Sequence, residues 1–124
     1  MQEKMKQLGF LRDDSQSAYF IACKNNGNEI LYKKVEGVKI DIGFDLFIYI
    51  GADDDMKGWA VSDGVTGTRL THFWPTELEA LSEVEQKIKE KGEESLENTI
   101  LTFVLSRGVT PRYYCEKAVC NGKN

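Results

Sequence analysis

A strict alternation of apolar residues runs through the middle of the chain. Every even-numbered position from 38 to 50 is apolar, and the series reads Val38, Ile40, Ile42, Phe44, Leu46, Ile48 and Ile50. A period of two over this length is typical of β-structure with one buried face. At ~3.3 Å per residue the run would be longer than most strands, so we expect it to bend or split near Gly43. The chain therefore centres on a sheet with one face open to water and a partner layer on the other.

Strand and turn signals on both sides of this run predict an antiparallel sheet of about five strands. The predicted strands are residues 17–24, 29–36, 38–50, 58–63 and 68–74. The last two would pair around a turn at residues 64–67, which places Val61 opposite Leu70 and Trp59 opposite His72. A charged loop is expected at residues 52–58.

Helix signals follow the strands. Thr76 is a good N-cap, Glu79 three residues later completes a capping box, and Gly92 is a suitable stop. Residues 94–107 fit both a helix and a strand, and we favour a helix because Gly108 follows as a stop signal. Strands first and helices later predict an α+β fold, with one or two C-terminal helices packed on one face of the sheet.

Length and composition predict a single domain, residues 1–124, in an ordinary globular class. Residues 1–14 are expected to form a short N-terminal helix or arm, and residues 112–124 a C-terminal tail segment. No apolar run approaches the ~18 residues of a membrane span, and the N-terminal stretch lacks the apolar core of a signal peptide. An odd number of cysteines, three, favours a reducing compartment. We therefore expect a cytoplasmic protein.

The charge of the chain argues against direct binding of nucleic acid. The net charge is -4, and each half of the chain carries more acidic than basic residues. A protein that contacts a phosphate backbone normally carries a basic stripe, which this sequence lacks. Acidic residues concentrate instead in the segment 77–97, at Glu77, Glu79, Glu83, Glu85, Glu90, Glu93, Glu94 and Glu97.

Two groups of residues could in principle bind a metal ion. Cys23, His72, Cys115 and Cys120 are the residue types of a zinc site, but the Cys115-x4-Cys120 spacing is at the edge of the usual range and nothing ties the four together. The consecutive aspartates at residues 53–55 do not have the alternate spacing of a calcium loop, and a solvated hairpin tip is the preferred interpretation. We therefore expect no metal and no cofactor.

A catalytic site is not indicated by any local motif. His72, the single histidine, could be combined with Cys23 or Cys115 as nucleophile and with Asp63 as orienting acid. No sequence signature supports that combination, and we interpret His72 as a residue packed on Trp59. The sequence thus favours a non-enzymatic protein.

An aromatic and arginine-rich set of residues suggests an interaction surface, because Trp, Tyr and Arg dominate interface hot spots. The candidate interaction residues are Trp59, Arg69, His72, Trp74, Arg112, Tyr113 and Tyr114. The alternative is that both tryptophans fill the layer between the sheet and a helix. Pro111 is expected to stop the preceding helix and to leave residues 112–114 as an extended recognition segment.

The run GWAVSDGVTGTRL at residues 58–70, followed by PTELEAL at residues 75–81, shows one resemblance. It resembles the "GW-x-V-S … T-G … T-x-x-E-A" hairpin-plus-helix pattern of small uncharacterised proteins of bacteria, phages and mobile elements. The resemblance covers roughly residues 58–88 and implies no activity and no site residue.

Three functions remain open from the sequence. The first is a non-enzymatic protein-interaction module that binds a protein partner or a second copy of itself. The second is an acidic inhibitor that occupies a nucleic-acid-binding groove of a host enzyme, with the carboxylates of residues 77–97 in place of phosphates. The third is a small-ligand binder or enzyme with a site around His72.

Overall fold

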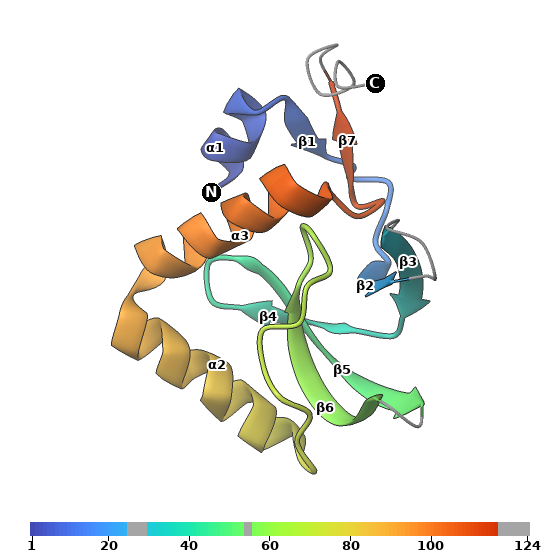
Figure 1. Cartoon of the computed structure of the whole chain (residues 1–124), viewed down its shortest axis with the longest axis vertical. Helices are drawn as coiled ribbons and strands as arrows, with labels where there is room; N and C mark the ends of the chain where they lie inside the picture. Colours follow the sequence, from blue (N-terminus) through green and yellow to red (C-terminus); the bar gives the residue numbers. More distant parts are fainter. Residues whose placement is uncertain (25–29, 54–55, 117–124) are drawn as a thin grey trace.

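The computed structural model describes residues 1–24, 30–53 and 56–116, and its fold is α+β (Figure 1). The elements in chain order are α1 (Gln2–Gln7), β1 (Phe10–Arg12), β2 (Tyr19–Lys24), β3 (Ile30–Val35), β4 (Val38–Asp41), β5 (Asp45–Asp53), β6 (Met56–Asp63), α2 (Glu77–Lys91), α3 (Glu93–Arg107) and β7 (Tyr113–Cys115). The α+β class expected from the sequence is confirmed.

The strands form three small antiparallel sheets rather than one five-stranded sheet. β4, β5 and β6 make a meander, β2 pairs with β3, and β1 pairs with β7. The alternating run splits at Gly43 as expected, because Gly43 adopts a φ of +88° between β4 and β5. The predicted loop at residues 52–58 is wrong, since the β5–β6 ladder continues through Gly51 and Gly58 to the pair Asp53 and Met56. The tip at residues 54–55 lies outside the described residues.

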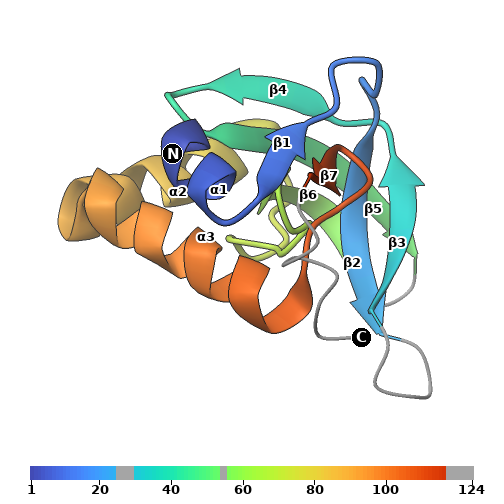
Figure 2. The same cartoon turned by 90° about the horizontal axis from the view of Figure 1, so that it is seen from above.

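Both faces of β5 are buried, so the prediction that one face is open to water is wrong. Leu46 and Ile48 lie in a core beneath the helices, whereas Phe47 and Tyr49 lie in a second core on the opposite face. Phe47 is 0% exposed. Figure 2 shows the reason: the β2–β3 hairpin lies against β5 on the side away from the helices and covers the second face.

The two C-terminal helices pack on the other face of the meander, and both are confirmed (Figure 1). Thr76 caps α2 by accepting a hydrogen bond from the Glu79 backbone N–H at 3.2 Å. Gly92, with a φ of +86°, ends α2 and begins α3, and Gly108 ends α3. Residues 94–107 are therefore helical, and the helix alternative is the correct one.

The segment at residues 68–74 runs beside β6 but is not a regular strand. Its first part has the expected register, because Leu70 donates its backbone N–H to the Val61 carbonyl at 2.8 Å. Its second part is displaced, and Trp59 faces Trp74 rather than His72. The displacement is accommodated because the Thr71 hydroxyl, rather than a backbone carbonyl, accepts the Val61 N–H.

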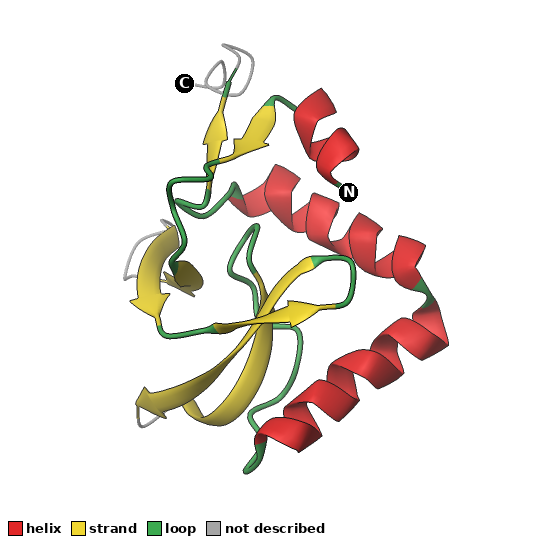
Figure 3. Ribbon diagram, turned by 180° about the vertical axis from the view of Figure 1, so that it is seen from behind, coloured by secondary structure: helices red, strands yellow, loops and turns green. Residues whose placement is uncertain are grey.

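The N-terminal and C-terminal segments meet at one end of the molecule (Figure 3). Residues 2–7 form the expected short helix, which has Leu8 as its C-cap and is followed by Gly9 with a φ of +94°. Phe10–Arg12 then pairs in antiparallel register with Tyr113–Cys115. The N-terminal arm and the C-terminal tail segment thus form one two-stranded sheet. Residues 117–124 lie outside the described part of the chain.

Candidate functional site

Two tryptophans and an isoleucine form one row across β5, β6 and the segment at residues 68–74. Ile50 faces Trp59 in the β5–β6 ladder, and Trp59 in turn faces Trp74. Trp59 and Trp74 exchange both backbone hydrogen bonds, at 2.7 and 2.8 Å. Residues directly opposite each other in an antiparallel pair point to the same face, so the three side chains are neighbours. Both indoles are partly buried against the core beneath the helices.

The row continues onto α2. Trp74 and Leu78 line a groove of about 600 Å³ along this helix. Leu78 is 73% exposed and Ile50 is 56% exposed, so large apolar side chains lie open on both sides of the indoles. We call Ile50, Trp59, Trp74 and Leu78 the tryptophan patch. Contiguous exposed apolar residues of this kind commonly mark a protein–protein contact.

Glu83 of α2 fixes the orientation of the patch. Its Oε1 accepts hydrogen bonds from the Trp74 Nε1 at 2.8 Å and from the His72 backbone N–H at 2.9 Å. The His72 Nδ1 lies 3.1 Å from the same oxygen, and the Lys87 Nζ lies 2.8 Å from the Oε2 atom. One carboxylate therefore joins the irregular segment 68–74 to α2 and holds the Trp74 indole in place.

The charge of Glu83 is stabilised by these neighbours. Partial burial disfavours the ionised carboxylate, but the hydrogen bonds from Lys87, His72 and Trp74 outweigh it and lower the pKa of Glu83 to about 2. Hydrogen bonds to a charged form favour that form. Glu83 is therefore an anion at any pH near neutrality, and its contribution to stability depends on that charge.

Replacing Glu83 with glutamine is expected to lower the free energy of unfolding by about 1–3 kcal/mol at pH 5, because charge-assisted hydrogen bonds are lost. The folded-state pKa of about 2 lies below the ordinary value of 4.5. The contribution of the carboxylate is therefore complete above pH 4.5 and is lost as the pH falls through 2. Urea unfolding at several pH values in this range should show the difference between wild type and Glu83→Gln shrinking in acid.

The exposed Glu85 on the same helix provides the matched control, and Glu85→Gln should leave stability nearly unchanged across the same range. A difference between wild type and Glu83→Gln that stays constant between pH 5 and pH 2 would contradict the assigned role of the charge.

Three of the candidate interaction residues from the sequence come together here, namely Trp59, His72 and Trp74. The His72 ring lies 6.4 Å from the Trp74 ring, centroid to centroid, and is packed against Trp74 rather than Trp59. Its side chain is 81% exposed, so the ring lies at the surface and not in an enclosed catalytic cavity. Arg69 lies on the same irregular segment, with its guanidinium 4.3 Å from the Phe73 ring centroid.

The segment 112–114 does not form the exposed recognition surface expected from the sequence. The Arg112 side chain is 6% exposed and is paired with Asp45, with 3.0 Å between Nη2 and Oδ1. Tyr113 is buried and donates its hydroxyl to the Asp45 Oδ2 at 2.8 Å. Burial and the adjacent Asp45 raise the pKa of Tyr113, so it remains a neutral donor. Tyr114 alone is exposed among the three residues.

Sequence reasoning missed the buried turn at residues 64–67, which it treated as a simple hairpin turn. Gly64, Val65, Thr66 and Gly67 are all buried. The Asp63 carboxylate accepts from the Thr66 N–H and hydroxyl, and burial raises the pKa of Asp63 to about 6 despite these hydrogen bonds. The short D-G-V-T-G string signals a turn, but nothing in it signals burial.

Three of the four residues that were weighed as zinc ligands lie in the described part of the chain, and the fold does not bring them together. Cys23 is a free thiol in the second core, Cys115 is disulfide-bonded, and His72 is engaged by Glu83. Cys120 lies outside the described residues. Within the described ranges, no group of three or more His, Cys, Asp or Glu side chains is placed to hold a metal ion.

The acidic segment 77–97 is divided between two helices, because the chain turns at Gly92. Two of its carboxylates bind groups of this chain. Glu83 binds the residues described above, and the Glu97 Oε1 lies 2.5 Å from the Lys4 Nζ. The remaining carboxylates do not form one continuous helical face. In the described part of the chain, no helix combines the length and apolar character required to cross a bilayer.

Comparison of the chain with protein families, with curated proteins and with solved structures found no match. The functional assignment therefore depends on the geometry of the chain itself.

Proposed function

We propose that this chain is a non-enzymatic protein-interaction module that binds a partner protein through the tryptophan patch. The observation that carries the proposal is the exposure of Ile50 and Leu78 on either side of Trp59 and Trp74. Tryptophan is enriched among the few residues that carry most of the binding energy at interfaces.

The orientation of the patch also supports this function. Two hydrogen bonds with Trp74 fix the Trp59 backbone, the core beneath the helices partly buries both indoles, and Glu83 holds the Trp74 indole. Side chains that are already ordered in the free protein lose little conformational entropy on binding. The patch is therefore preorganised to bind a rigid apolar surface.

Charge around the patch indicates the chemistry of the partner. The exposed Glu77 and Glu79 flank Leu78 on α2, and the whole chain carries a net charge of -4. Two copies meeting face to face would bring like charges together, which disfavours self-association. We infer a partner that presents apolar anchor residues surrounded by lysine or arginine.

The test compares two double variants with matched changes. Ile50→Ser with Leu78→Ser removes the exposed aliphatic side chains of the patch. Leu31→Ser with Leu105→Ser makes the same kind of change at exposed positions on β3 and α3, away from the patch. Tagged wild-type and variant proteins are incubated with lysate from the cells that express the chain, at about 0.05 M and about 0.5 M salt. Circular dichroism confirms that all of the proteins are folded.

The expected result is a specific partner that wild type and the β3/α3 variant retain at both salt concentrations and that the patch variant loses. With the purified partner, the patch variant should bind at least tenfold more weakly, since two anchor side chains are removed. Equal binding by the patch variant and wild type would contradict the proposal. Loss of the partner from wild type at high salt would instead favour charge mimicry, and a dimer by sedimentation velocity would favour self-association.

We also propose a cytoplasmic location and an origin in a phage or mobile element, on the cysteine count and on the pattern at residues 58–88. The disulfide at Cys115 is an argument against a reducing compartment, in which disulfides are rare. Fractionation of cells that express the tagged chain tests the location, and recovery of the chain in the cytoplasmic fraction is the expected result. Recovery outside that fraction would contradict the proposed location.

A further inference from the structure

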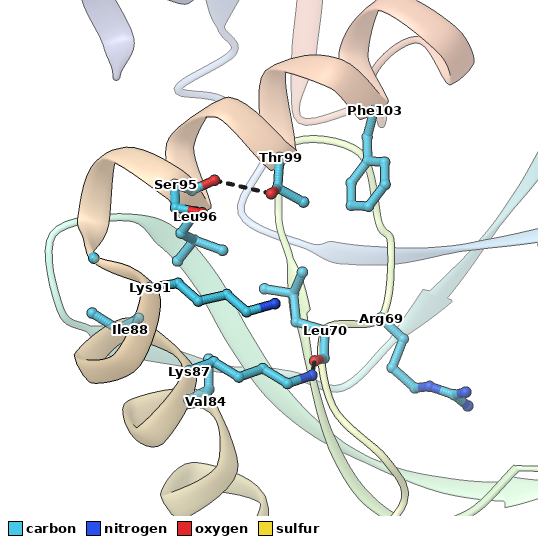
Figure 4. A pocket seen from close by; sticks show the side chains of 11 residues that line it. Arg69, Leu70, Val84, Lys87, Ile88, Lys91, Ser95, Leu96, Thr99 and Phe103 are labelled. Atoms are coloured by element: carbon cyan, nitrogen blue, oxygen red, sulfur yellow. Dashed lines mark hydrogen bonds between the residues drawn. The ribbon is translucent and has the colours of Figure 1, made fainter.

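A cleft of about 260 Å³ lies between α2, α3 and the segment at residues 69–70 (Figure 4). Its apolar lining comes from Leu70, Val84, Ile88, Leu96 and Phe103. The cleft is separate from the groove beside Trp74 and Leu78, although Lys87 borders both. Ligand sites are typically concave, mostly apolar and provided with a few polar groups that orient the ligand.

The charged groups at this cleft are cationic, although the chain as a whole is acidic. Arg69, Lys87 and Lys91 line it, and none of the described residues in the lining carries a carboxylate. Lys87 is already engaged, because its Nζ donates to the Leu70 carbonyl at 2.6 Å and pairs with Glu83. Figure 4 shows Lys91 reaching from α2 across the cleft, whereas the Arg69 guanidinium points away from its centre. Lys91 is thus the cation placed to meet a ligand.

We propose that this cleft binds a small aliphatic carboxylate, with the hydrocarbon chain among the leucines and isoleucine and the carboxylate beside Lys91. The neutral hydrocarbon fits the apolar lining, and the negative head group complements a rim that has cations and no acids. A cavity of roughly 150 Å³ holds benzene, so one of about 260 Å³ holds ~10 non-hydrogen atoms. Octanoate has that size.

The probe is sodium octanoate, titrated into the full-length protein and followed by calorimetry and by backbone amide chemical shifts. A ligand of this size is expected to bind one to one with a dissociation constant on the order of 0.1–1 mM at low salt. Hexanoate should bind about fifteenfold more weakly, because two buried methylene groups are lost. The shifts should centre on residues of α2 and α3 that line the cleft, such as Ile88 and Leu96.

Two lysine variants on the same helix test how much the charge of Lys91 contributes to octanoate binding. Lys91→Gln should weaken octanoate binding about fivefold, and salt should weaken the binding to wild type. Lys89→Gln removes the same charge at an exposed position outside the lining of the cleft, and it should bind octanoate as wild type does. The neutral alcohol 1-octanol should bind wild type more weakly than octanoate and should not distinguish wild type from Lys91→Gln.

Three results would overturn the proposal. The first is the absence of a saturable chemical-shift change at about 10 mM octanoate, a concentration well above the expected dissociation constant. The second is an equal affinity of wild type and Lys91→Gln for octanoate. The third is an equal affinity of wild type for octanoate and 1-octanol. The outcome is independent of the partner experiment, since Lys91 does not belong to the tryptophan patch.

Discussion

Replacing Arg112 with alanine is expected to lower the free energy of unfolding by about 3–5 kcal/mol, because it leaves the Asp45 carboxylate, which is only 18% exposed, without its cation. The Arg112 Nη2 and Nε atoms lie 3.0 and 3.3 Å from the two carboxylate oxygens of Asp45. The same guanidinium donates to the Ala18 carbonyl at 3.0 Å and lies 4.1 Å from the Tyr19 ring centroid. One side chain thus joins β5, the start of β2 and the segment that precedes β7.

Urea unfolding of Arg112→Ala and Tyr114→Ala measures this effect with a control from the same segment. Tyr114 is 49% exposed, so Tyr114→Ala should change stability by less than about 1 kcal/mol. The further change Asp45→Asn in the Arg112→Ala background should restore part of the lost stability, because the buried charge is removed. A loss of less than about 1 kcal/mol in Arg112→Ala would show that the pair is exposed to solvent in solution.

Replacing Gly67 with alanine is expected to be as damaging, at about 3–5 kcal/mol. Gly67 has a φ of +75°, and an added Cβ would lie 2.8 Å from the backbone N of Ala22 and the carbonyl oxygen of Phe20. The Gly67 carbonyl also accepts the Ala22 N–H at 2.9 Å. A methyl group would therefore push the buried turn away from β2 and break the contact between the turn and the β2–β3 hairpin.

The variant Gly43→Ala distinguishes the two causes of this loss, which are backbone strain and steric contact of the added methyl group. Gly43 has a φ of +88°, but an added Cβ would meet nothing within 4 Å. Gly43→Ala should therefore cost only the backbone strain of the left-handed conformation, about 1–2 kcal/mol. Thermal and urea unfolding of both variants provide the comparison. Equal losses in Gly43→Ala and Gly67→Ala would mean that the close approach of the turn to β2 does not exist in solution.

Local features of the sequence were sufficient to predict α2, α3 and the split of the alternating run. The Thr76–Glu79 capping box, Gly92 and Gly43 each act on the few residues beside them, so their effect can be read without tertiary structure. The first part of the register between β6 and residues 68–70 was also correct, because a short turn determines it.

Contacts between distant segments account for what was wrong. The alternation in β5 suggested one face open to water, but Phe47, which lies on that face, is covered by the β2–β3 hairpin. Arg112 was expected at the surface because it follows a proline. It is instead buried, because it pairs with Asp45, which lies 67 residues earlier in the chain. Neither pairing leaves a periodic signal in the sequence.

The candidate site was predictable only in part. Residue type alone pointed to Trp59 and Trp74, since tryptophan is frequent at interfaces. Ile50 belonged to the alternating apolar run and was expected in the core, and nothing local in the sequence distinguished Leu78 from the buried residues of α2. Their exposure depends on how far the helices cover the sheet, which is a property of the assembled fold.

The pairing of β1 with β7 has a consequence for the protein during its synthesis. Phe10–Arg12 leaves the ribosome early, but its partner Tyr113–Cys115 is translated about a hundred residues later. Until then β1 has an unpaired edge, and the Asp45 carboxylate has no Arg112 to neutralise it. A nascent chain stopped before residue 112 is therefore expected to remain open at this end and to depend on chaperones more than the finished chain does. The sheet at this end of the fold therefore forms only after β7 has been translated.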